Sequence, residues 1–383
     1  MYKEQLDTID RANAFLQQCT SQSILLEPPR SKRRSRHTKA EFKSIRKHAT
    51  SLYNVIVKGN CWKCECKDRH VASLRLEARP RTIKDSTAGF CFRLLLCKNV
   101  TDGDTRSMSD WRGITVEPEP ATLSRVLSDG LGVMDDICAK IFPLTIAEER
   151  IGYLHENVYS EYRHRVDLTD AKLGSKFRTK SLDQLLNSGG QGPPQYFLSR
   201  RHRLNIAAIL ASSVLQLDQT SWLKSQWKSN DICFHYRDED TVLTSKPTFP
   251  PPHVACRLSD SNSEPNCAVE SPLPRAQHAR SEALLTLGLA LVELCFGRTL
   301  EKMQIPEDVD QNENLTRLNT AIRKLDEVYN ESGGHYGDVV RRCLYCSFDV
   351  RDASLDDEEF EQDVFDYVVT PLIEDIEVFD GGR

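Results

Sequence analysis

The sequence contains no run of about 18 apolar residues, the length that a membrane-spanning helix needs, so it predicts no transmembrane segment. It also lacks a Gly-x-Ser-x-Gly motif, a His-Glu-x-x-His motif and a P-loop, the signatures of common hydrolases, metalloproteases and nucleotide hydrolases. Basic charge is not in excess. The net charge of −5 argues against nucleic-acid binding by the whole protein. The polar residues Met1–Asp7 are not typical of a secretory signal.

Cysteine, by contrast, is abundant. The 13 cysteines are odd in number and scattered, and several lie in apolar runs: Cys91, Cys97, Cys138, Cys295 and Cys343. Buried free cysteine packs as a small hydrophobic residue. With no secretory signal, this pattern predicts reduced thiols in a cytoplasmic protein. The basic run Arg30–Lys39 leaves nuclear targeting or contact with anionic lipid open beside a solvated linker, but it lacks the interleaved aromatic residues used for stacking on nucleic acid.

Changes in pattern along the chain predict three parts. Residues 1–40 are expected to form a short amphipathic helix (1–25) and a basic linker. Residues 41–180 are expected to form a helix ending near Val57 and a small antiparallel sheet, with strands at 70–79 and 90–97 and a helix at 123–142. Residues 181–383 are expected to be mainly helical. A sheet-rich first part followed by helices predicts an α+β fold with two lobes.

Within the third part, the periodicity of apolar residues predicts the individual helices. The expected helices are Ser181–Leu186, Ser199–Leu217, Glu282–Gly297, Leu315–Tyr329, Gly337–Leu344 and Ser354–Glu377, the last with Ser354 as its N-cap. Residues 232–234 predict a short strand. The many prolines, serines and asparagines of 247–274 predict a long surface loop.

The segment Glu282–Gly297 is apolar on almost every face and too short to cross a bilayer, which indicates a helix buried in a helical domain. Its Leu287-Gly288 and Glu293-Leu294 pairs resemble the central buried helix of the protein-kinase large lobe, which reads D-x-W-S-L-G-x-x-L-x-E-L. This resemblance implies a two-lobed, protein-kinase-like fold. It also implies a structural role for Gly288.

The residues that catalyse phosphoryl transfer are replaced in the same comparison. The kinase His-Arg-Asp falls on Lys224-Ser225-Gln226, the metal-binding asparagine on Asp231, and Asp-Phe-Gly near Thr244–Pro247. The aspartate that anchors the catalytic loop becomes Ala283, and no Gly-x-Gly-x-x-Gly occurs in the sheet-rich part. We therefore predict no catalytic residue, no cofactor-binding residue and no cofactor.

Two other stretches resemble kinase features that hold the fold together. Ala268-Val269-Glu270 lies near the Ala-Pro-Glu position, and Arg342–Arg351 resembles the late stretch K-C-L-x-x-D-P-x-x-R. In kinases that glutamate pairs with that arginine, so the resemblance implies a buried Glu270–Arg351 ion pair. The alternative is that Glu270 is an ordinary loop residue.

A wider resemblance covers roughly residues 40–383. The segments Ile45–Tyr53, Cys64–Leu76, Ile206–Leu217 and Leu287–Gly297 are similar to a fungal family of domains of unknown function, which often follow a HeLo-like prion-inhibition-and-propagation domain. This resemblance implies a pseudokinase-like module that binds other proteins in self-recognition or cell-death signalling. The alternative is a nucleotide-binding protein or atypical phosphotransferase.

A second alternative, a small zinc-stabilised binding module, rests on Cys61, Cys64, Cys66 and His70. Thiolates and imidazole are zinc ligands, and Cys-x-x-Cys is a common half-site. Most structural sites, however, join two half-sites across a longer loop. Because four ligands within ten residues would strain the tetrahedron, the sequence favours a cysteine-rich turn and no metal here.

Overall fold

The computed structural model describes residue 13 and residues 42–59, 61–78, 90–101, 107–120, 132–144, 150–156, 161–170, 177–188, 197–237, 249–258, 281–348 and 353–381. The chain divides after Glu41, and Phe42–Arg383 form one compact unit. Apart from residue 13, the predicted helix at 1–25 and the basic run at 30–39 lie outside the described part, as do Glu270, Arg351 and the segment 244–247.

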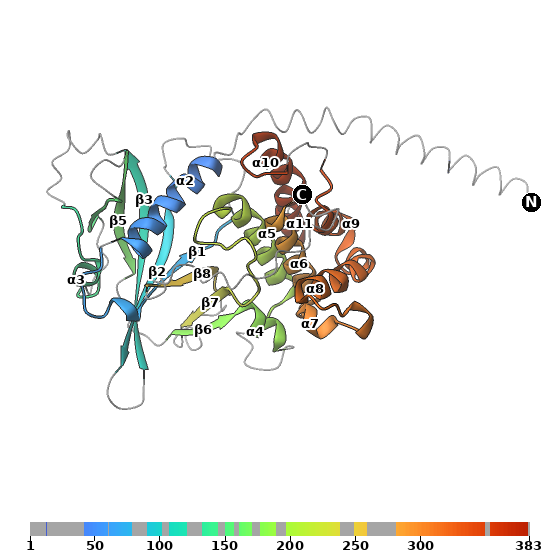
Figure 1. The fold of residues 1–383 in the computed structure, drawn as a ribbon, viewed down its shortest axis with the longest axis horizontal. Coiled ribbons are helices and arrows are strands. Elements are labelled where there is room, and N and C mark those ends of the chain that lie inside the picture. Colours follow the sequence, from blue (N-terminus) through green and yellow to red (C-terminus); the bar gives the residue numbers. More distant parts are fainter. Residues whose placement is uncertain are drawn as a thin grey trace, which may run out of the picture. The chain divides into compact units, whose positions relative to one another are not determined.

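One eight-stranded sheet forms the centre of this unit (Figure 1), and its strand pairings are antiparallel. In sheet order the strands are β4 (Gly152–Leu154), β5 (Tyr162–Asp170), β3 (Ser107–Pro120), β2 (Phe92–Thr101), β1 (His70–Arg75), β8 (Pro252–Arg257), β7 (Ile232–Arg237) and β6 (Phe177–Ser181). The mixed α+β class is thus as predicted. The sheet nevertheless includes strands from both sides of residue 180, where the sequence suggests a boundary.

The prediction of a surface loop over 247–274 is wrong for residues 252–257, which form β8. This strand lies between β1 and β7, with Val254 opposite both Leu74 and Ile232. Pro252 is tolerated because it is the first residue of the strand, where a missing N–H costs least. Its neighbours His253 and Val254 are buried. The proline-rich composition therefore concealed a central strand.

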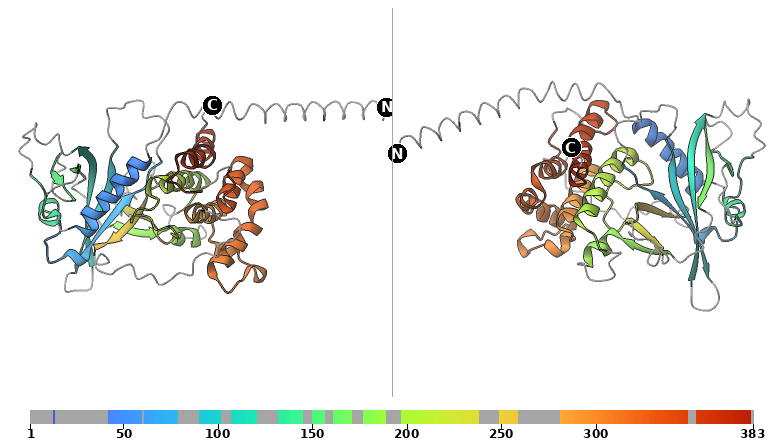
Figure 2. Two further views of the ribbon diagram at one scale, coloured as in Figure 1. Left: turned by 45° about the horizontal axis from the view of Figure 1, so that its top comes forward. Right: turned by 180° about the vertical axis from the view of Figure 1, so that it is seen from behind.

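Helices cover the sheet at two places. The helices are α2 (Phe42–Tyr53), α3 (Ile137–Ile141), α4 (Leu182–Asn187), α5 (Arg200–Leu217), α6 (Glu282–Phe296), α7 (Leu300–Met303), α8 (Glu313–Arg323), α9 (Leu325–Tyr345), α10 (Glu358–Val364) and α11 (Thr370–Phe379). Short π-helical turns at Asn54–Lys58 and Phe365–Val369 extend α2 and join α10 to α11, and 3-10 turns occupy Lys67–Arg69 and Pro306–Asp308. Figure 2 shows α5 to α11 gathered at one end of the unit and α3 at the other.

Helices α5 and α6 begin and end where the sequence indicates. Ser199 caps α5 by accepting a hydrogen bond from the His202 amide, and Ser281 does the same for α6. Helix α6 ends at Gly297, whose φ of +63° is the left-handed conformation that glycine adopts readily. Every residue from Ala283 to Cys295 is buried, so this helix forms the centre of the helical part.

Gly288 lies where α6 approaches α9 most closely. A Cβ atom here would be 2.9 Å from Cδ2 of Leu344 and 3.0 Å from Cβ of Cys343. The absence of a side chain lets the two helices pack directly, and the hydroxyl of Tyr336 donates to the carbonyl of Leu291 nearby.

Several helix predictions need correction. In place of the expected helices Leu315–Tyr329 and Gly337–Leu344, α8 ends at Arg323 and α9 runs from Leu325 to Tyr345 with a kink at Gly333. Residues 132–136 of the predicted helix 123–142 are not helical. They are extended, and Asp136 caps α3 by accepting from the amides of Cys138 and Ala139. The last helix begins at Glu358 because Asp357, not Ser354, accepts from the amides of Glu359 and Phe360. A carboxylate at the N-cap also interacts favourably with the helix dipole.

Among the described residues, the helices are all too short or too polar to cross a membrane.

Candidate metal centre and the loop after helix α5

Residues 218–231, between α5 and β7, form the loop on which the kinase comparison places the catalytic residues. The loop is a series of turns. Lys224 and Ser225 are exposed, and Gln226 is half-buried. The last position of this triplet, where the kinase has its catalytic aspartate, is therefore a half-buried amide and not a carboxylate.

Asp231, at the position of the metal-binding asparagine, is used by the backbone. Its Oδ2 accepts from the Lys228 amide at 2.8 Å, and its own amide donates to the Lys228 carbonyl at 2.9 Å. The side chain therefore closes the turn that leads into β7.

Helix α6 holds this loop in place, but not through Ala283. The hydroxyl of Thr286 donates to the Ser225 carbonyl at 3.2 Å, and the hydroxyl of Ser229 donates to the Glu293 carboxylate. Glu293 also accepts from the amide of Leu300 at 3.2 Å and lies 3.6 Å from Arg317.

The Glu293 side chain is only 2% exposed, and burial raises its pKa. Sequence reasoning missed this anchor. The available signal was a single charged residue inside an otherwise apolar helix.

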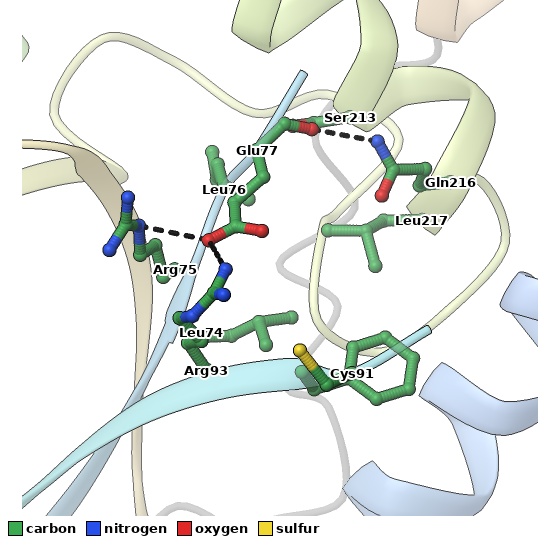
Figure 3. A pocket seen from close by; sticks show the side chains of 10 residues that line it. Leu74, Arg75, Leu76, Glu77, Cys91, Arg93, Ser213, Gln216 and Leu217 are labelled. Atoms are coloured by element: carbon green, nitrogen blue, oxygen red, sulfur yellow. Dashed lines mark hydrogen bonds and ion pairs between the residues drawn. The ribbon is translucent and has the colours of Figure 1, made fainter. Parts of the chain in front are cut away.

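A pocket lies between the end of β1, the start of β2 and α5 (Figure 3). Glu77 occupies it and pairs with Nε of Arg75 at 3.0 Å and with Nη1 of Arg93 at 2.6 Å. Gln216 donates from Nε2 to the Glu77 carbonyl at 2.8 Å. A phosphate would have to displace the chain's own carboxylate from both arginines.

Three thiols and one imidazole converge at the start of β1. Cys64 and Cys66 lie in the turn before the 3-10 turn, His70 is the first residue of β1, and Cys138 lies in α3. Their three Sγ atoms and the histidine nitrogen all lie within 4.8 Å of one another. Nε2 of His70 is 3.4 Å from Sγ of Cys64 and 3.3 Å from Sγ of Cys66, and Sγ of Cys66 is 3.7 Å from Sγ of Cys138.

Cys61, the fourth residue of the sequence-based set, does not join this cluster. Its thiol donates to the Val55 carbonyl at 2.9 Å, and its own carbonyl accepts from the Ile137 amide at 2.8 Å. The sequence therefore identifies three of the four converging residues. Cys138 was expected to be only a packing residue in an apolar run.

The orientation of His70 is fixed by its other ring nitrogen. Nδ1 lies 3.2 Å from the Cys97 carbonyl on β2, and a carbonyl oxygen can only accept, so Nδ1 carries the proton. Burial lowers the pKa of His70, which keeps the ring neutral. The lone pair of Nε2 therefore faces the sulfur atoms. Trp62 and Phe142 flank the ring at centroid distances of 4.5 and 5.3 Å.

The thiols lie in a partly desolvated environment. Burial raises the pKa of Cys64, and it raises the pKa of Cys138 to about 12. For Cys64 and Cys138, burial thus favours the neutral thiol over the thiolate. A bound metal ion would stabilise the thiolate form, which is the form that coordinates metals.

Other bonds fix the positions of the segments 61–70 and 132–144, which carry the four residues. Nζ of Lys63 lies 2.6 Å from a carboxylate oxygen of Asp135, an exposed pair. Arg112 of β3 donates to the Phe142 carbonyl at 2.8 Å on the far side of α3. Bonds before α3 (at Asp135) and after it (at Phe142) thus fix the segment that carries Cys138.

A family model described as a domain of unknown function (DUF7580) matches residues 39–379, and the chain belongs to this family. No curated protein matches the chain, and no solved structure does.

Proposed function

We propose that this domain is a non-catalytic, pseudokinase-like interaction or regulatory module. The observation that carries the proposal is that the Asp231 carboxylate bonds the backbone of its own loop. The one carboxylate at a predicted metal-binding position accepts from the Lys228 amide and closes a turn. Phosphoryl transfer depends on acids positioned for metal ions and for the substrate hydroxyl, and this loop is built instead from residues that support its own backbone.

The packing of the helical part supports the kinase-like interpretation. Helix α6 is buried along its length, lies between α5 and α9, and fixes the loop after α5 through Thr286 and Glu293. We propose that the sheet and this helical part correspond to the small and large lobes. The continuous sheet is a departure, because β7 and β8, from the second half of the chain, belong to the same sheet as β1 to β6.

The biological setting follows from the family resemblance. We propose that the domain is fungal and HeLo-associated, that it binds other proteins in self-recognition or cell-death signalling, and that it acts in the cytoplasm or the nucleus. These expectations rest on similarity of sequence and on no measured property of the site.

Titration of the full chain with ATP, with and without Mg²⁺, tests the non-catalytic half of the proposal. Binding to the folded state alone would raise stability by about 2.7 kcal/mol at a hundredfold excess over Kd. We expect no shift in melting temperature up to millimolar ATP, and the same result for Asp231→Asn, which restores the kinase residue. A Mg²⁺-dependent shift in either protein would favour the nucleotide-binding alternative.

The interaction half of the proposal has its own test. The chain has a mass of 43.6 kDa. Expressed at native level and extracted gently from its host, it should elute in an assembly larger than that mass, at a size that does not change when ATP is added. Elution as a free monomer would contradict the interaction role.

A further inference from the structure

We propose that the cysteine–histidine cluster at the start of β1 binds one zinc ion in a closed site with four protein ligands. The ligand atoms are Sγ of Cys64, Cys66 and Cys138 and Nε2 of His70. This inference goes beyond the proposed function and does not depend on it, because a kinase-like or an unrelated domain could equally be built around such a site.

Three edges of the cluster have nearly the lengths found in a zinc tetrahedron. Zn–S bonds of about 2.3 Å and Zn–N bonds of about 2.0 Å imply edges of about 3.8 Å between sulfurs and about 3.5 Å between sulfur and nitrogen. The observed edges are 3.7 Å for Cys66–Cys138 and 3.4 and 3.3 Å for His70 with Cys64 and Cys66. The other three edges are no longer than 4.8 Å, so a mononuclear ion would require the ligand atoms to move by at most about 1 Å.

Support around the ligands is also what a zinc site needs. A ligating histidine usually donates its second N–H to a carbonyl or carboxylate, which fixes the ring and the tautomer. His70 does this through Nδ1 to the Cys97 carbonyl. The Cys138 amide donates to Oδ1 of Asp136, so the backbone that carries this ligand is fixed as well.

A disulfide does not account for the cluster. Bonded sulfurs are about 2.05 Å apart, whereas Sγ of Cys66 and of Cys138 are separated by 3.7 Å. The sequence raised the objection that four ligands within ten residues would strain the tetrahedron. This objection does not apply to the observed cluster. Cys138 replaces Cys61, and it lies 72 residues after Cys66. Residues 64–70 thus supply three ligands and a distant segment supplies the fourth, so the four ligands do not have to come from one short turn.

The ligand set indicates what the ion does. Sites with three thiolates and one imidazole are tetrahedral, and catalytic sites instead keep one position open for water or substrate. This site is therefore structural. It fastens residues 132–144, whose only helix is the five-residue α3, to the first strand of the sheet. A helix of that length has little stability of its own.

Metal analysis of the full-length chain tests the proposal. The chain is purified without metal-affinity resin from cells supplied with zinc, and zinc is measured by mass spectrometry on the folded, monodisperse fraction. We expect about one zinc ion per chain. Replacement by Co²⁺ should give the visible d–d bands of tetrahedral cobalt and a near-ultraviolet thiolate charge-transfer band. Zinc far below one equivalent together with no cobalt spectrum would overturn the proposal.

Matched variants assign the ligands. Cys138→Ser should lower bound zinc to below about one tenth of an equivalent, because removal of one thiolate opens the site. The control is Cys61→Ser, since Cys61 lies in the same segment but bonds Val55, so this variant should retain full zinc. Equal zinc in the two variants would show that the metal binds elsewhere.

A third variant distinguishes a change of zinc ligand from a failure of the protein to fold. Cys64 is the partly exposed ligand, so Cys64→His has room to supply imidazole in place of thiolate. We expect this variant to keep about one zinc ion and, with cobalt, to show a charge-transfer band weakened by about one third, because two thiolates remain of three. An unchanged cobalt spectrum would exclude Cys64 as a ligand and overturn the proposed set.

Discussion

The corner at the start of β1 and the loop after α5 are both turns leading into a strand, and they use their reactive residues in opposite ways. In the corner, Cys64, Cys66 and His70 direct their side chains to a common point with Cys138. In the loop, Asp231 and Ser229 direct theirs to nearby protein groups, the Lys228 amide and the buried Glu293.

The difference shows that side chains are available to bind a ligand only where they are not needed as hydrogen-bond partners of the backbone. The corner joins its two segments through the bond from the Ile137 amide to the Cys61 carbonyl and through the Lys63–Asp135 pair, and this leaves four other side chains for a metal. The loop needs its polar side chains to complete its turns. Four perturbations, taken from the largest expected effect to the smallest, test this contrast.

Metal removal should have the largest effect. If zinc is present at a thousandfold excess over Kd, its loss lowers the free energy of unfolding by about 4 kcal/mol. Urea unfolding with and without a strong chelator measures this loss. Cys138→Ser should be as unstable as the chelated wild type and should not respond to chelator. If chelator does not change the free energy of unfolding of the wild type, the corner does not hold a stabilising metal ion and the contrast with the loop fails.

Loss of the Glu293 carboxylate should have the next largest effect. Glu293→Ala leaves Arg317 buried beside only the partly exposed Glu301 and deprives Ser229 of its acceptor. Breaking a buried pair in this way costs roughly 3–5 kcal/mol. Thr286→Val, which removes only the bond to Ser225, should cost about 1 kcal/mol. Similar small losses in both variants would mean that α6 does not hold the loop as described.

Acid should destabilise the sheet through histidines outside the corner. Burial lowers the pKa of His235, on β7, to about 4. The unfolded chain therefore binds more protons between pH 6.5 and 4, so the stability from the neutral ring is full above pH 6.5 and is lost as pH falls towards 4. The loss from this residue is about 2–3 kcal/mol at pH 4.5.

The variant His235→Asn can keep a hydrogen bond to Thr179, the partner of Nδ1 at 3.0 Å. Unfolding measured from pH 7 to 4.5 in the presence of chelator should show a shallower decline for this variant than for wild type. Parallel curves would place the acid sensitivity in other groups.

The smallest effect is expected in the loop itself. Asp231→Asn keeps an oxygen acceptor for the Lys228 amide, and Gln226→Ala removes a half-buried side chain at the catalytic-aspartate position. Each should change the free energy of unfolding by less than about 0.5 kcal/mol. A much larger loss for Gln226→Ala would show that this position has a role in the fold that its contacts do not reveal.

Elements with a strong local signal could be predicted from the sequence. Helices α5 and α6 have long apolar patterns with serine caps, and both were predicted to within two residues at each end. Ser181 begins α4 with a capping box, again as the local sequence indicates. In these cases the decisive interactions lie within a few residues of one another.

Features that depend on distant partners could not be predicted in this way. The position of β8 depends on pairing with both β1 and β7, which its prolines obscure. The corner depends on Cys138, whose five-residue helix gives no sign that it packs beside Cys66. Spacing alone therefore favoured Cys61, the nearer cysteine. The anchor at Glu293 was hidden for the same reason, because its partner Ser229 is far away in the sequence.

The central place of β8 also affects how the chain can be synthesised. Val71 of β1 pairs with Arg257 of β8, so one edge of the first strand has no partner until the ribosome has produced the rest of the sheet. At about 5–20 residues per second, that interval is roughly 10–35 seconds. During this time β1 presents open backbone groups to other nascent chains. Proteins truncated before residue 252 should therefore depend on chaperones for solubility in a way that the full chain does not.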